Sequence, residues 1–325
     1  MLFIYKVPKG VKRMIDVDTL LGDHRTRYFG NGHKRTNYKI VFDENKNQFY
    51  GEITQLGLWS NKSDKVIQPH LSTLDGLILA SLLVEKYLES KNELPENFYL
   101  SKFTIKSGMK PIENLNKVPV VLRKVKLDKD GIEFNIFVLD MKVEIEFQQF
   151  AIFSRKDNEE SIEKKDYLQN HLKDIHHNIY DVSFLETLDT TDKCSIFCKT
   201  NKVISKNNEY KGISSNLSKN YSLLELLIIF SQMAEMLAYH ADDINRECSE
   251  TLWMKNVSAE ISELIPNGEL ELLGKITKNK LLDMKGKNWK IFEMSGTDTQ
   301  SRIKISSKIA HQLPESDVEV LSDVQ

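Results

Sequence analysis

An acid and a histidine stand just ahead of a strongly apolar run. His70 and Asp75 flank Ser72 and Thr73, and residues 77–84 that follow contain a single polar side chain. A carboxyl group where a buried helix begins can exchange protons with a substrate hydroxyl or enol if burial raises its pKa toward neutrality. A histidine does the same near neutral pH. Asp75 and His70 are therefore candidate catalytic residues, and Ser72 and Thr73 are candidate substrate contacts.

The same residues also have a purely structural explanation. The apolar run predicts a helix over residues 73–89 that is buried on most sides, because no polar face is present. Ser72 fits its N-cap position, and Asp75 three residues later completes a capping box. Such a cap contributes about 1 kcal/mol to stability and requires no chemistry. From these residues alone, both the cap and the catalyst stay open.

A second stretch repeats this pattern 150 residues further along the chain. Ser222 and Glu225 match the serine and the acid, and an apolar run follows, which predicts a second buried helix over residues 222–245. Gln232 lies among apolar residues of this helix, so it must be hydrogen-bonded if it is buried. We include Glu225 and Gln232 among the predicted substrate contacts, although a cap and a structural hydrogen bond would also explain them.

Three cations surround a turn near the N-terminus. Arg27, Lys34 and Arg35 flank Gly-Asn-Gly at residues 30–32, and these residue types tolerate the positive φ of a turn. The cations could hold a phosphate, a carboxylate or sugar oxygens, or they could be solvated charges beside a turn. The segment is no P-loop, because the Gly-Lys-Ser/Thr ending is missing.

Other charged or polar groups are expected to be solvent-exposed. Asp242 and Asp243 fit a solvated helix end. The neighbouring histidines His176 and His177 have no cysteine or acid at ligand spacing, so an exposed pair is the better interpretation than a metal site.

Segments with strand character precede and follow each predicted helix. They alternate apolar and polar residues or are rich in Val, Ile and Phe, and turn residues separate them, as in antiparallel hairpins. A sheet wrapped around one apolar helix is the hotdog arrangement, so we predict an α+β fold with two hotdogs in tandem. Its parts are residues 1–154 (the first hotdog with an N-terminal extension), 155–190 (a polar linker with a helical piece) and 191–325 (the second hotdog). The predicted strands cover residues 38–42, 50–56, 98–105, 118–127, 132–150, 194–198, 203–204, 251–261, 270–277, 289–294 and 303–309.

The composition is that of an ordinary soluble protein. A net charge of -2 over 325 residues gives no support for nucleic-acid binding. Three cysteines cannot all pair, and none has zinc-site spacing. We find neither a signal peptide nor a segment long enough to span a membrane. We therefore expect a cytoplasmic protein with no metal, cofactor, nucleic-acid partner or membrane span, and we leave a homodimer open.

Three motifs carry a resemblance to a known family. Residues 28–35 (Tyr-Phe-Gly-Asn-Gly-His-Lys-Arg), 59–62 (Trp-Ser-Asn-Lys) and 69–75 (Pro-His-Leu-Ser-Thr-Leu-Asp) resemble the bacterial avirulence protein D family in their order. That family is associated with syringolides, which are acyl-sugar lactones assembled from a 3-oxoacyl chain and a ketopentose. It is similar to the butyrolactone (A-factor) synthases. The resemblance adds Trp59, in the second motif, to the predicted substrate contacts.

A weaker resemblance points to dehydratases. Residues 70–75 are similar to the His-Pro-x-Leu-Leu-Asp segment of polyketide-synthase dehydratase double hotdogs, in which the helix aspartate is catalytic. Gln232 resembles the glutamine of the Ala-Gln segment of acyl-thioester dehydratases. The chain lacks their His-x-x-x-Gly-x-x-x-x-Pro segment, which puts dehydration in doubt.

These resemblances imply a synthase that joins a 3-oxoacyl thioester, carried on coenzyme A or an acyl carrier protein, to a ketose or similar acceptor. Two alternatives remain open. The first is a hotdog dehydratase or thioesterase, and the second is a non-catalytic module that binds acyl ligands.

Overall fold

The computed structural model describes residues 16–62, 65–108, 110–128, 131–150, 163–186, 194–206, 208–249, 251–284 and 286–314. Twelve strands of this part of the chain form one sheet in the order β1-β2-β6-β7-β8-β5-β14-β18-β17-β16-β11-β10. Every neighbouring pair in it is antiparallel. The strands are β1 (Thr36–Asp43), β2 (Gln48–Gln55), β5 (Phe98–Lys106), β6 (Val118–Leu127), β7 (Gly131–Val138), β8 (Met141–Gln149), β10 (Ile175–Glu186), β11 (Cys194–Ile204), β14 (Leu252–Ile261), β16 (Leu270–Met284), β17 (Lys287–Asp298) and β18 (Ile303–Gln312).

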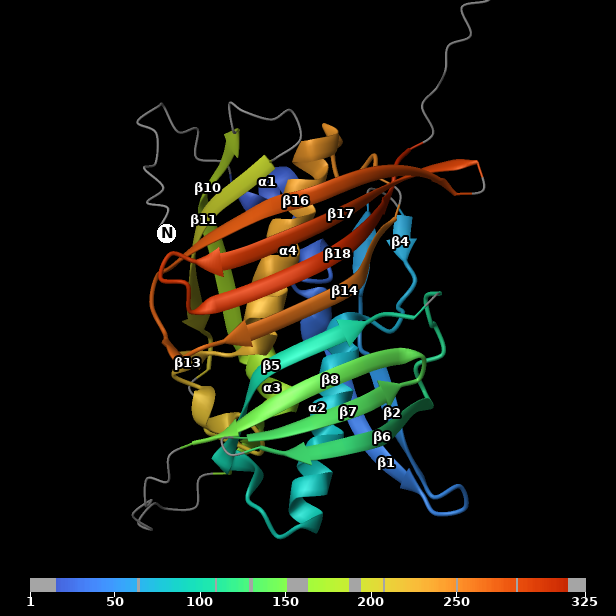
Figure 1. The fold of residues 1–325 in the computed structure, drawn as a ribbon, viewed down its shortest axis with the longest axis vertical. Helices are drawn as coiled ribbons and strands as arrows, with labels where there is room; N and C mark the ends of the chain where they lie inside the picture. The colour runs from blue at the N-terminus through green and yellow to red at the C-terminus, as the bar shows by residue number, and fades with distance from the viewer. Residues whose placement is uncertain are drawn as a thin grey trace, which may run out of the picture.

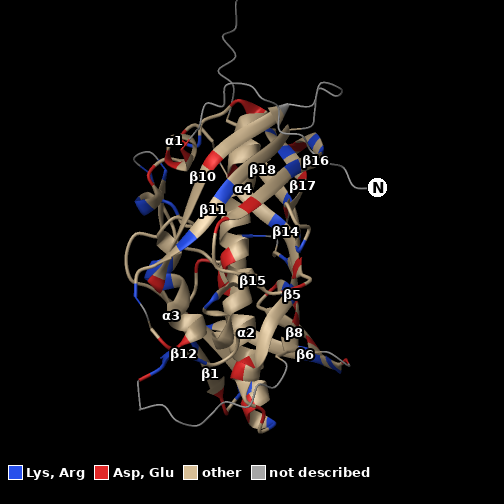
Figure 2. Ribbon diagram, turned by 90° about the vertical axis from the view of Figure 1, so that its left-hand side faces the viewer, with Lys and Arg blue, Asp and Glu red and all other residues tan. Residues whose placement is uncertain are grey.

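Two long helices lie inside the curve of this sheet. Figure 1 looks onto the outer face of the sheet, with α4 behind the upper strands and α2 behind the lower ones. In Figure 2 the two helices follow one another along the long axis of the molecule. The helices are α1 (Val17–Leu21), α2 (Thr73–Ser90), α3 (Tyr167–Asp174) and α4 (Leu223–Asp242), with short 3₁₀ turns η1 (His24–Thr26), η2 (Gly32–Arg35), η3 (Pro95–Asn97) and η4 (Ser215–Leu217).

Short strand pairs complete the described structure. They are β3 (Ser60–Lys62) with β4 (Lys65–Ile67), β9 (Lys165–Asp166) with β12 (Tyr210–Lys211), and β13 (Asn220–Tyr221) with β15 (Ile265–Pro266).

This architecture confirms the predicted double hotdog. The first-half strands wrap α2 and the second-half strands wrap α4, and both helices begin within one residue of the predicted position. Within the described sheet the halves meet at one seam, where residues 102–106 of β5 pair with residues 256–260 of β14. The domain limits given above stay a prediction. The range proposed as a linker holds α3 and all of β10, and its residues 155–162 and 187–190 lie outside the described residues.

Both central helices are buried because they are apolar on nearly every side. Leu74, Leu77 and Leu79 of α2 are wholly inaccessible to solvent, as are Leu226 and Leu227 of α4. Helix α4 is long and apolar enough to cross a membrane, but 89% of its apolar window is buried inside the protein. Burial of this kind is what a core helix shows, because the strands and not lipid cover its apolar faces.

Two glycines let α4 approach the sheet. Gly274 and Gly296 are paired across β16 and β17 and face α4. A Cβ at Gly296 would lie 2.4 Å from the Phe230 ring, whereas one at Gly274 would meet Ile196 and Met233 side-chain ends at 3.0 and 3.3 Å.

We therefore expect Gly296→Ala to lower the free energy of unfolding by about 1–3 kcal/mol, because overpacking forces a core ring to move. Gly274→Ala is the matched control and should cost less, since flexible side-chain ends can shift. Urea unfolding of the three proteins measures both effects. Equal stability of Gly296→Ala and wild type would contradict the close packing of α4 on the sheet.

Candidate functional site

The predicted capping box at α2 is present. The Ser72 hydroxyl accepts a hydrogen bond from the Asp75 backbone N–H at 3.1 Å, and Asp75 Oδ2 accepts one from the Ser72 backbone N–H at 2.8 Å. The structural role proposed for these two residues is therefore real. It uses only one of the two carboxylate oxygens.

The other oxygen of Asp75 faces two tyrosines. Oδ1 accepts hydrogen bonds from the Tyr38 hydroxyl at 2.7 Å and the Tyr28 hydroxyl at 3.1 Å, and Asp75 is 2% exposed. Burial raises the pKa of Asp75, and the hydrogen bonds from Tyr38, Ser72 and Tyr28 oppose that shift. Burial and the nearby Asp75 charge raise the pKa of both tyrosines well above the ordinary value. The Asp75 carboxyl group can therefore hold a proton and pass it on.

The other predicted residues of the first motif lie around this carboxyl group. The Tyr28 hydroxyl is 2.6 Å from the Ser72 hydroxyl. His70 is half-buried, and its ring centroid lies 4.5 Å from that of Trp59, which lies 4.6 Å from that of Tyr28. A row of three mutually tilted rings thus leads from His70 to the tyrosine that binds Asp75. Among the described contacts, His70 and Asp75 make no direct hydrogen bond, and the Thr73 hydroxyl is directed at Met254 Sδ, 3.8 Å away.

Arg27 connects this region to the second half. Its guanidinium donates to Gln232 Oε1 of α4 at 2.8 Å, to Asp18 Oδ1 at 2.8 Å and to the Gly22 carbonyl at 2.9 Å. Arg27 is 2% exposed. Protein groups therefore take the place of the water that would solvate this charge. A buried guanidinium requires such partners. The expectation that Gln232 is hydrogen-bonded is confirmed, with a side chain as its partner.

A polar cavity of about 300 Å³ lies beside Arg27 and Gln232. Lys34 lines it, and burial lowers the pKa of this lysine to about 8. His33 also lines it, with Nδ1 2.8 Å from the Tyr28 carbonyl oxygen, and burial lowers its pKa to about 4. His176 and His177 of β10 form part of the opposite lining. Three of the predicted substrate contacts (Arg27, Lys34 and Gln232) therefore meet at one cavity.

Arg35 and Glu225 lie elsewhere. The Arg35 guanidinium donates to the Leu58 carbonyl at 3.1 Å and does not line the polar cavity. Glu225 forms the second capping box with Ser222, and the Lys202 ammonium lies 3.1 and 3.2 Å from its two carboxylate oxygens. Lys202 and Glu225 side chains are 1% and 2% exposed, so this is a fully buried ion pair.

Two expectations of solvent exposure are wrong. The His177 side chain is 6% exposed, because β10 turns it toward the N-terminal end of α4. The Asp242 side chain is 2% exposed, and it binds His311 Nδ1 at 2.7 Å and Lys290 Nζ at 2.6 Å. Strands β17 and β18 supply these partners, and they cover the end of α4 that local polarity had suggested was solvated.

The sequence reasoning also missed Tyr28, Tyr38 and Lys202 as members of these polar centres. Tyr28 was present only as part of a family motif, and Tyr38 only as an apolar position of a strand. A buried acid predicts that donors must surround it. It does not predict which ones, because Tyr38 is 37 residues away from its acid.

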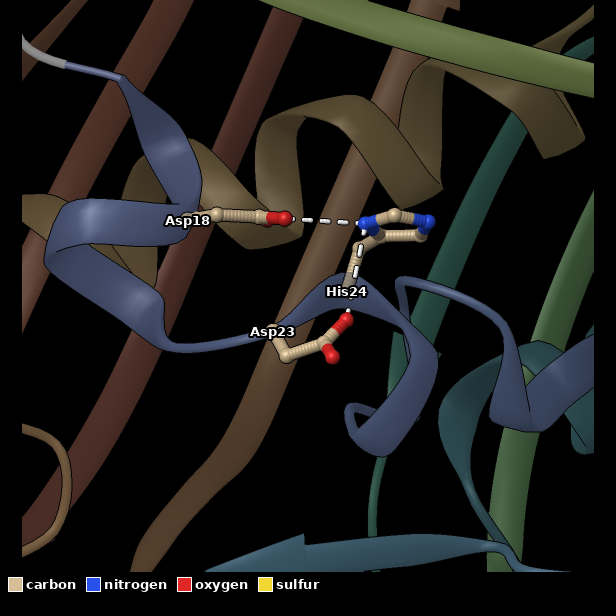
Figure 3. A group of neighbouring side chains, drawn as sticks. All are labelled: Asp18, Asp23 and His24. Carbon is tan, nitrogen blue, oxygen red and sulfur yellow. Dashed lines mark hydrogen bonds and ion pairs between the residues drawn. The ribbon is translucent and has the colours of Figure 1, made fainter.

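Asp18, Asp23 and His24 form a cluster with metal-ligand chemistry (Figure 3). Its acids already have cationic or hydrogen-bonding partners. Asp18 lies 2.8 Å from both His24 Nδ1 and Arg27 Nη2, and Asp23 pairs with Arg25. We interpret the cluster as the ion-pair network that positions Arg27 at the cavity.

The pKa of Asp75 leads to a prediction about stability. The folded state holds this proton more tightly than the unfolded chain, whose aspartate pKa is 3.8. Stability should therefore fall as the pH rises from about 4 through the folded-state pKa. Asp75→Asn cannot titrate and should lose less stability over that interval.

Tyr38→Phe removes a donor to the carboxylate, so it should raise the pKa of Asp75 further and extend the decline to higher pH. Urea unfolding between pH 4 and 8 measures all three proteins. Parallel curves for wild type and Asp75→Asn would show that burial does not raise this pKa.

Several solved structures resemble this fold. A search of curated proteins finds no match. Among solved structures, a TesB protein of Mycobacterium avium subspecies paratuberculosis is 8% identical with a TM-score of 0.41, over 81% of this chain and 92% of that one. A putative oleoyl thioesterase of Lactobacillus plantarum is 8% identical with a TM-score of 0.42, over 86% and 96%. The dehydratase domain of RzxB from Pseudomonas fluorescens is 9% identical with a TM-score of 0.36, over 84% and 97%.

These likenesses are remote and concern the fold alone. The family comparison is more specific, because the model of the Pseudomonas avirulence D protein (AvrD) matches residues 12–314. That range includes all three motifs from which the resemblance was drawn. The chain belongs to the AvrD family.

Proposed function

We propose that this protein is a hotdog enzyme that acts on acyl thioesters and joins a 3-oxoacyl group to a ketose or similar polyhydroxy acceptor. The acyl group would arrive as a thioester of coenzyme A or an acyl carrier protein, and the product would be an acyl-sugar lactone. Membership of the AvrD family supports the reaction class. The single observation that carries the proposal is the polar cavity beside Arg27, Lys34 and Gln232.

The lining of the cavity favours an acceptor rich in hydroxyl groups. An apolar occupant would leave the charged Lys34 without a polar partner, which costs about 1–3 kcal/mol. A hydroxyl can accept from Lys34 and can donate to Nε2 of His33, because Nδ1 of this neutral ring already donates to the Tyr28 carbonyl. In this proposal Lys34 and Arg27 orient the acceptor or the carrier phosphate, and Arg35 remains a predicted contact without a place in the cavity.

The acyl chain needs a different environment. A small apolar cavity of about 20 Å³ lies between α4 and the sheet, lined by Phe230, Met233 and Leu237 among others. In this conformation the cavity is too small for an acyl chain. Methionine and the neighbouring side chains can change rotamer, so we propose that the chain enters here by displacing Met233.

The chemistry begins with acyl transfer. The acceptor oxygen attacks the thioester carbonyl carbon, the C–O bond forms and the C–S bond breaks, and the acceptor proton ends on the departing thiolate. The carbon between the two carbonyls of the 3-oxoacyl group is acidic, and its attack on the acceptor ketone closes the lactone ring. We propose that Asp75, through the Tyr28 hydroxyl, takes the proton from this carbon and returns it to the alkoxide formed at the acceptor ketone, and that His70 packs at the outer end of the row of rings that holds Tyr28.

Thiol release should therefore depend on the acceptor. With a 3-oxoacyl thioester and no sugar we expect slow release, because a synthase must keep water out of the reaction. Adding xylulose should accelerate release and yield a product whose mass contains both parts. Asp75→Asn should form little of this lactone at matched folded concentration. Rapid release that xylulose does not change would identify a thioesterase and overturn the proposal.

The role of Lys34 can be tested separately. Losing one charged hydrogen bond of about 1.5–3 kcal/mol should raise the KM for the acceptor about tenfold or more in Lys34→Gln, with little change for the acyl donor. Lys39→Gln is the matched control, because Lys39 is an exposed lysine of β1. An unchanged acceptor KM in Lys34→Gln would place the acceptor outside this cavity.

A further inference from the structure

The second helix start holds a polar centre that the proposed reaction has not used. Glu225 accepts from the Ser222 backbone N–H at 3.2 Å and pairs with Lys202. His177 Nε2 lies 4.0 Å from Glu225 Oε2, which is outside hydrogen-bond distance. His177 also lines the polar cavity. It is therefore the residue that connects the buried ion pair to the space proposed for the acceptor.

The imidazole of His177 is buried without a partner for Nε2. An unsatisfied buried nitrogen costs about 1–3 kcal/mol, and a histidine that only supported the fold would be expected to bond to the carboxylate beside it. The gap of 4.0 Å leaves this bond unmade in the neutral state. A proton gained by the ring would create the attraction that closes the gap.

The charges around His177 favour the neutral ring. Burial lowers the pKa of His177 well below the ordinary value, and His33, Lys202, Lys34 and His176 lower it further. Glu225 is the acid that faces it. A neutral imidazole at neutral pH can accept a proton, and the fixed carboxylate can then stabilise the imidazolium.

The matching place in the first half offers no such base. There the buried acid, Asp75, faces the hydroxyls of Tyr28 and Tyr38, whose pKa values lie well above the ordinary value. Hydroxyls in that state keep their protons at neutral pH and donate hydrogen bonds to the carboxyl group, so neither tyrosine serves as a base. The two polar centres therefore suit different steps of one reaction.

We propose that His177 is the general base that removes the proton from the acceptor hydroxyl, with Glu225 and Lys202 as its positioning residues. This inference rests on the function proposed above. As the acceptor oxygen bonds to the thioester carbonyl carbon, its proton moves to the imidazole. The C–S bond then breaks, and the imidazolium returns the proton to the thiolate, so the ring ends the transfer neutral.

The first test is His177→Gln, assayed for thiol release with saturating 3-oxoacyl thioester and xylulose. Removing a general base should lower kcat about 10²–10⁴-fold. His240→Gln is the matched control, since His240 is an exposed histidine of α4 that stacks on Phe184. It should retain the wild-type kcat. Near-wild-type turnover by folded His177→Gln would overturn the assignment.

The second test separates a positioning role from a structural one and does not need His177 to be replaced. Glu225→Gln removes the carboxylate that favours the imidazolium, so the pKa of His177 should fall. The acidic limb of the kcat/KM profile should then move to lower pH. A loss of rate with no movement of that limb would show that Glu225 supports only the fold, and the dyad would be wrong.

The outcomes also distinguish this inference from the proposed function. If the wild-type protein releases thiol without regard to xylulose, the function itself fails. If it transfers the acyl group to xylulose and His177→Gln does so equally well, the function stands and only the base is misassigned.

Discussion

The buried guanidinium of Arg27 is the constraint on which the rest of the site depends. It cannot remain inside the protein without anionic and carbonyl partners, and these come from the N-terminal extension and from Gln232 of α4. The next residue, Tyr28, reaches in the other direction to Asp75 of α2. One dipeptide thus connects the two helices, and the segment that contains it forms a wall of the polar cavity. A change at Arg27 would remove the hydrogen bond that joins this segment to Gln232 of α4.

Each half of the protein solves the same physical problem in its own way. Both buried helices begin with a serine and an acid, and both acids are almost wholly inaccessible to solvent. In the first half, two tyrosine hydroxyls donate to the carboxyl group, and burial raises its pKa against the effect of these hydrogen bonds. In the second half, an ammonium group pairs with the acid: burial raises the pKa of Glu225, and Coulomb attraction and hydrogen bonds from Lys202 oppose that shift. The same local motif therefore supports two different kinds of chemistry.

The sequence predicts the features whose signals come from neighbouring residues. Capping boxes and apolar runs lie within a few neighbouring residues, so both helices and their starts were predictable, as was the double hotdog. The partners of the acids lie far away in sequence: Arg27 and Gln232 are 205 residues apart. Local polarity also misplaced His177 and Asp242, because strands from elsewhere in the chain cover them. The cations around the turn and the family motif both point to residues 28–35, but neither signal indicates which helices this segment joins.

The seam between β5 and β14 has a consequence for how such a protein can change over generations. In a pair of identical subunits, every substitution appears twice, so both centres must tolerate it. Here the two halves that meet at residues 102–106 and 256–260 are parts of one continuous chain. A substitution in one half therefore does not appear in the other. A duplicated and fused gene could for this reason keep an acid among tyrosines at one helix start while acquiring a lysine and a histidine at the other.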